Sequence, residues 1–127
     1  NGKKILDEIK NINEKNKKKF SNEEAQLDKE RNDIKKLKNI ISKEEYNKKV
    51  ALFQEKVELY NKEKTKIIKS FENKKKKELD NFFNNLNNIM NIYMKENKIS
   101  LIIEKKNIVM AATKNDISNQ ILELVNK

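Results

Sequence analysis

Residues 46–71 carry the strongest constraint on the fold, because apolar and aromatic residues recur there at alternating intervals of four and three. The series is Tyr46, Val50, Phe53, Val57, Tyr60, Lys64, Ile67 and Phe71, and only Lys64 departs from it. This spacing puts one narrow apolar seam on an α-helix, as in a coiled coil. The chain has no Pro and one Gly, so little interrupts long helices. We predict one helix from about residue 43 to about residue 97.

The first third of the chain predicts a second, more sparsely apolar helix, from about residue 3 to about residue 40. Ser42 with Glu45 three residues later is a capping box, which marks the start of a helix. We therefore place a tight reversal near residues 40–43, and the two helices form a long antiparallel hairpin, a coiled-coil arm. The prediction of the first helix rests on the spacing of its apolar residues, which are Ile5, Ile9, Ile12, Phe20, Leu27, Ile34 and Ile41.

A reversal near residue 42 also predicts which residues face each other, because the numbers of opposed residues then sum to about 84. Phe20 then faces Lys64, Phe53 faces Arg31 and Tyr60 faces Glu24. Two interpretations remain open for the rings that meet charges. Long charged side chains cover the rings with their stems, or Phe53 and Tyr60 stay partly open and bind an apolar client.

The last thirty residues change character, and we predict a small β-hairpin over residues 99–112 followed by a helix over residues 116–126. Two helices with a narrow seam and one hairpin bury little surface, so a folded monomer is not expected. We divide the chain into an arm, residues 1–80, and an oligomerisation body, residues 81–127. The fold class is mainly α. The residues expected to hold the body together are Phe82, Phe83, Leu86, Ile102, Val109 and Leu122.

The composition excludes most enzymes. The chain has no Cys and no His, so it can form no zinc finger, no cysteine nucleophile and no Ser-His-Asp triad. One Gly excludes a P-loop and a dinucleotide fingerprint. Carboxylates are plentiful, but no segment builds a concave pocket around them. We expect no enzyme activity, no cofactor and no metal.

The formal net charge is +10, which points to electrostatic partners. Lys17, Lys18 and Lys19 form one basic cluster, either a solvated helix face or a contact for an anionic client or lipid headgroup. A basic coiled coil that binds nucleic acid is the main alternative function. Acidic residues are interspersed with the Lys residues, however, and no RNA-binding aromatic signature occurs, so we expect no nucleic acid. A structural spacer, the other alternative, leaves the last thirty residues unexplained.

The C-terminal segment resembles the Skp/OmpH family of periplasmic chaperones. The resemblance lies in Leu101-Ile-Ile-Glu-Lys-Lys-Asn-Ile-Val-Met110, in Asn115-Asp-Ile-Ser118 and in Leu122-Glu-Leu-Val-Asn126. Ile41-Ser-Lys-Glu-Glu45 is similar to the segment at the helical reversal of that family. Met110 stands where an aromatic residue is common. Because the chain begins at Asn1 and not at Met, we expect a targeting segment and the family's first β-strand upstream.

The resemblance implies a homotrimer in which helical arms enclose a central cavity. It implies a holdase that works without ATP, binding unfolded outer-membrane proteins in the periplasm and preventing their aggregation. The client-contacting candidates on the arm are Phe53, Tyr60 and the cluster Lys17–Lys19. Lipopolysaccharide or an anionic membrane surface is a further partner that the family suggests, although no motif for it is matched here residue by residue.

Overall fold

The computed structural model describes residues 2–126, and within them it confirms the two long helices. Helix α1 spans Gly2–Lys36 and continues into the short 3-10 helix η1, Leu37–Asn39. Helix α2 spans Lys43–Glu96. The predicted boundaries of both helices lie within a few residues of these, because uninterrupted apolar spacing and strong helix formers act along the whole of each segment.

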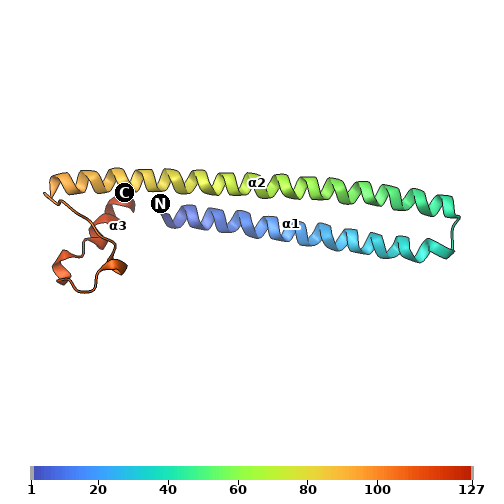
Figure 1. Cartoon of the computed structure of the whole chain (residues 1–127), viewed down its shortest axis with the longest axis horizontal. Helices are drawn as coiled ribbons and strands as arrows, with labels where there is room; N and C mark the ends of the chain where they lie inside the picture. Colours follow the sequence, from blue (N-terminus) through green and yellow to red (C-terminus); the bar gives the residue numbers. More distant parts are fainter. Residues whose placement is uncertain (1, 127) are drawn as a thin grey trace. The chain divides into compact units, whose positions relative to one another are not determined.

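The chain divides into two compact units, of which the first is Glu8–Lys74 and is called the arm here. Within it α1 and α2 run antiparallel, side by side, as Figure 1 shows. The reversal occupies residues 40–42, and the capping prediction is confirmed, since the Glu45 backbone N–H donates to Ser42 Oγ at 3.2 Å. The Tyr46 N–H donates to the Ser42 carbonyl at 3.0 Å and so closes the first turn of α2.

The seam of the arm follows the predicted spacing and register. All eight positions from Tyr46 to Phe71 in the series are half-buried. The Tyr60 hydroxyl donates to Glu24 Oε1 at 2.7 Å, and Lys64 Nζ lies 5.3 Å from the centre of the Phe20 ring. Both pairs sum to 84, so the predicted facing of these residues is confirmed.

The second unit joins the start of α1, up to Asp7, with the chain from Lys75 onward. At the end of α2, Lys98 takes a left-handed backbone conformation with φ 56°, and the Ile99 N–H donates to the Met94 carbonyl at 2.9 Å. This is the usual way to satisfy the last carbonyls of a helix, although Gly is more common at that position. Helix α3 then spans Ser118–Asn126.

The predicted β-hairpin over residues 99–112 is wrong: no strand occurs in the described part of the chain. In its place two short 3-10 helices occur, η2 at Lys105–Asn107 and η3 at Thr113–Asn115. The backbone is extended at Glu104, Ile108 and Ala112. A two-stranded ribbon is marginal in water without a third strand or a covering helix, so β-branched composition alone does not pair these segments.

Very little of the chain is buried. Among the described residues, Val125 in α3 is the one buried apolar side chain, with 8% exposure. Gly2 allows α1 to start close to α2, because a Cβ there would lie 3.1 Å from the Phe82 ring.

Candidate functional site: a charged helical hairpin with an apolar groove

The interface between α1 and α2 in the arm mixes apolar residues with cross-helix ion pairs. Lys19 Nζ lies 2.5 Å from Glu63 Oε1, and Lys56 Nζ lies 2.6 Å from Glu30 Oε1. Both pairs are solvent-exposed to a large extent, so each is expected to contribute little to stability. Both pairs join the two helices and are consistent with the register of the seam.

The middle of the arm contains one connected polar cluster. Glu24 accepts a hydrogen bond from Lys64 at 2.6 Å and another from the Tyr60 hydroxyl. These two bonds lower the pKa of the Glu24 carboxyl, and the bond to Glu24 raises the pKa of Lys64. Partial burial, and then the bond to Glu24, raises the pKa of Tyr60. The ammonium of Lys64 also lies over the rings of Phe20 and Tyr60.

This cluster includes Tyr60, one of the two aromatic residues predicted from the sequence to contact a client. Tyr60 is half-buried, its hydroxyl is bonded to Glu24 and its ring lies 5.6 Å from the Lys64 ammonium. Phe53 is also half-buried. Its expected neighbour Arg31 forms an ion pair with Asp28 on its own helix at 3.0 Å. The Lys64 ammonium therefore lies over the Tyr60 ring, while both aromatic side chains keep some access to solvent.

The basic cluster on α1 is split by its helical positions. Lys17 and Lys18 are exposed. Lys19 is half-buried and pairs with Glu63 and, at 3.8 Å, with Glu23. The bond to Glu63 raises the pKa of Lys19. Two of the three predicted contact lysines thus face solvent, and the third pairs with a carboxylate on the other helix.

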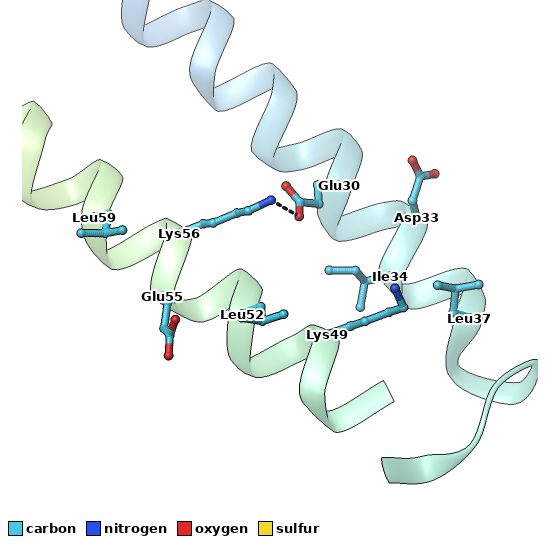
Figure 2. Close-up of a pocket in the computed structure, with 9 residues that line it drawn as sticks. All are labelled: Glu30, Asp33, Ile34, Leu37, Lys49, Leu52, Glu55, Lys56 and Leu59. Atoms are coloured by element: carbon cyan, nitrogen blue, oxygen red, sulfur yellow. Dashed lines mark hydrogen bonds and ion pairs between the residues drawn. The ribbon is translucent and has the colours of Figure 1, made fainter. Parts of the chain in front are cut away.

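An apolar groove, which the sequence does not predict, lies on one side of the arm between α1 and α2. Its apolar lining consists of Ile34 from α1, Leu37 from η1, and Leu52 and Leu59 from α2. Figure 2 shows Lys56 reaching across the groove to Glu30. In the sequence, the groove is indicated by Leu52 and Leu59, which lie seven residues apart and outside the seam.

The residues predicted for oligomerisation all belong to the second unit, and they differ in exposure. Phe82, Leu86 and Ile102 are half-buried. Phe82 and Phe83 form an edge-to-face pair with ring centres 5.6 Å apart. Several apolar side chains between residues 83 and 122 face solvent: Phe83, Ile92, Leu101, Ile103, Ile108, Val109, Met110 and Leu122.

Asp116 organises the segment before α3. Its Oδ1 accepts the Ser118 backbone N–H at 3.0 Å, and its Oδ2 accepts Lys105 Nζ at 2.9 Å. The bonds from Ser118 and from Lys105 hold the pKa of Asp116 well below its ordinary value. Asp116 thus caps the start of α3, and its pair with Lys105 links the 3-10 helix η2 to the same place.

Over residues 2–126, neither long helix contains an apolar stretch able to cross a bilayer. The same residues hold no cluster of three or more acidic side chains suited to a metal ion.

Comparison with known protein families matches residues 1–125 to the family described as outer membrane protein (OmpH-like). The chain belongs to the OmpH-like family. This confirms the resemblance to the Skp/OmpH family that the sequence indicates. OmpH-like proteins are periplasmic chaperones of outer-membrane proteins and not enzymes. No curated protein and no solved structure matches the chain at a significant level.

Proposed function

We propose that this OmpH-like protein is a holdase that binds unfolded outer-membrane proteins in the periplasm and prevents their aggregation without ATP. The family match over residues 1–125 carries the proposal. The arm supports it, because a charged hairpin with partly open apolar side chains can make many weak contacts. Such contacts retain a client by multivalency while each one breaks quickly.

The charge of the arm supports a role in client capture. Residues 8–74 contain 19 Lys and Arg against 13 Asp and Glu, a net charge of +6. A positive arm attracts acidic clients and accelerates their association in a salt-sensitive way. Lys17 and Lys18 are the proposed first contacts, and Phe53 and Tyr60 then supply apolar contact through their exposed edges. Release needs no nucleotide, since a client that folds buries the surface being held.

The second unit supports assembly into a homotrimer. Its solvent-facing apolar side chains and the nearly absent core of the single chain leave a large area for association. We propose that Val109 and Leu122, together with Phe82, Phe83, Leu86 and Ile102, form the contact between copies, so that three arms enclose a cavity.

The proposal is tested by diluting a urea-unfolded outer-membrane β-barrel protein into nucleotide-free buffer with the full chain. We expect suppressed light scattering and a soluble complex that holds one client per assembly. Unchanged scattering would reject the proposal. A gel shift with duplex DNA at physiological salt, without any effect on scattering, would favour a nucleic-acid-binding coiled coil instead.

A further inference from the structure

The apolar spacing of the arm does not by itself choose one register. The seam residues in the first half of the arm recur every seven residues, and so do the α2 positions that face them. The first series is Phe20, Leu27, Ile34 and Ile41, and the second is Val50, Val57, Lys64 and Phe71. A shift of one helix against the other by one heptad therefore brings the two series opposite each other again.

A shifted register offers at least as many apolar pairs as the observed one. In the observed register opposed residues sum to 84, and the two series give two apolar pairs, Leu27 with Val57 and Ile34 with Val50. A register with sums of 77 also gives two apolar pairs. A register with sums of 91 gives three, namely Phe20 with Phe71, Ile34 with Val57 and Ile41 with Val50. Apolar contact therefore does not favour the observed register, and other side chains select it.

Lys64 is the one charged residue among the eight seam positions of α2, and the observed register surrounds it with partners on both helices. Its ammonium lies 2.6 Å from Glu24 Oε1. The same ammonium lies 5.3 Å from the centre of the Phe20 ring and 5.6 Å from that of Tyr60. The Tyr60 hydroxyl donates to the same Glu24 oxygen at 2.7 Å. These four residues, two from each helix, are called the register cluster here.

Neither shift by one heptad preserves the register cluster. Sums of 91 place Arg31 where Glu24 lies, and sums of 77 place Lys17 there. Either cation repels the Lys64 ammonium, which also loses its carboxylate partner. In both shifts the place of Phe20 passes to a residue without an aromatic ring, so the cation–π contact is lost as well. The charges therefore disfavour the registers that the apolar series permit.

We propose that the register cluster holds the hairpin in the observed register, against the alternative with sums of 91 that the apolar series equally allow. Lys64 is a positioning residue in this device, because it replaces an apolar seam residue and finds its partners in one register. A polar residue at a seam position specifies register at some cost in stability. The cap at Ser42 favours the same register. The inference concerns the arm alone and does not depend on the proposed function.

Engineered cysteine pairs report the register, because the chain has no Cys of its own. Ile34→Cys with Val50→Cys reports sums of 84, and Ile34→Cys with Val57→Cys reports sums of 91. A disulfide needs Cα atoms within about 7 Å, whereas a one-heptad shift moves facing residues about 10 Å apart along the axis. The full chain is oxidised with copper–phenanthroline, and chains linked to each other are removed on a non-reducing gel. Mass spectrometry after proteolysis then quantifies the intrachain disulfide.

In the otherwise unchanged chain we expect the disulfide for sums of 84 and almost none for sums of 91. Lys64→Glu should raise the disulfide for sums of 91 at least about tenfold, because the new carboxylate repels Glu24 and pairs with Arg31 in the shifted register. Lys64→Leu should raise it too, without lowering the melting temperature of the helical circular dichroism signal, since Leu suits the seam in either register. Lys66→Glu, the same change at an exposed position of α2, is the matched control and should leave both disulfides unchanged.

The outcomes separate the selection of a register from stabilisation alone. No rise of the disulfide for sums of 91 in either Lys64 variant overturns the proposal, and so does an equal rise in Lys66→Glu. A Lys64→Leu variant that melts at a lower temperature and keeps the observed register shows that the cluster only stabilises the arm, and also overturns it. Equal formation of both disulfides with Lys64 in place shows that nothing holds the register.

Discussion

Replacement of Val109 and Leu122 by Asn is expected to dissociate the proposed trimer. Val109 is fully exposed in the single chain and Leu122 is 58% exposed. Burial of a whole Val or Leu side chain contributes about 1.5–3 kcal/mol. The complete side chain of Val109, at the low end of that range, and the exposed 58% of Leu122, at the upper part of it, are each worth about 1.5 kcal/mol. Loss of both removes about 3 kcal/mol from each chain and about 9 kcal/mol from a trimer.

The effect on assembly follows from the stoichiometry. The midpoint concentration of a monomer–trimer equilibrium varies as the square root of its dissociation constant. Full burial therefore predicts a shift of about 10³-fold, and half of that burial predicts about 40-fold. Sedimentation velocity over about 0.1–100 µM protein measures the shift. The Leu52→Asn, Leu59→Asn variant, altered on the arm alone, is the matched control and should keep the wild-type midpoint. A wild-type chain that stays monomeric throughout, or a double variant that assembles normally, would refute the reasoning.

Four further outcomes are expected. Rising salt should slow client capture in stopped-flow measurements while the mass of the assembly persists; a flat salt profile argues against electrostatic capture. Phe53→Ser with Tyr60→Ser should speed client dissociation without abolishing the helical circular dichroism signal, and unchanged retention removes these rings from the site. Glu24 has a lowered pKa in the folded arm, so its ionised form stabilises the arm above its ordinary pKa of 4.5, and this stabilisation is lost as the pH falls through the lowered pKa. Glu24→Gln should therefore reduce the change in melting temperature over this acidic range, and an unaltered melting profile would contradict the prediction. Ser42→Ala should cost about 1 kcal/mol in urea unfolding, and a cost near zero shows that the cap is dispensable.

The arm could be predicted from the sequence because its determinants are local. The heptad spacing fixes which side of α2 faces α1, and the Ser42 cap fixes where the chain reverses. These two facts together give the register, so the Tyr60–Glu24 and Phe20–Lys64 pairs follow by arithmetic. Each step depends on residues within a few positions of one another along the helix.

The segment after α2 could not be predicted in the same way. Apolar β-branched residues around Ile102 and Val109 are typical of strands, but strand pairing depends on distant partners that a local pattern does not contain. The groove was missed for a related reason. Leu52 and Leu59 look like scattered surface residues in the sequence, and the apolar lining arises only when the hairpin brings Ile34 and Leu37 to the same side of the arm.

The central claim is tested most directly by light scattering of a urea-unfolded outer-membrane β-barrel protein diluted into buffer that contains the full chain and no nucleotide. The account predicts that scattering falls to the level of the buffer once the chain reaches about three copies per client. Scattering that follows the chain-free curve at every ratio would contradict it.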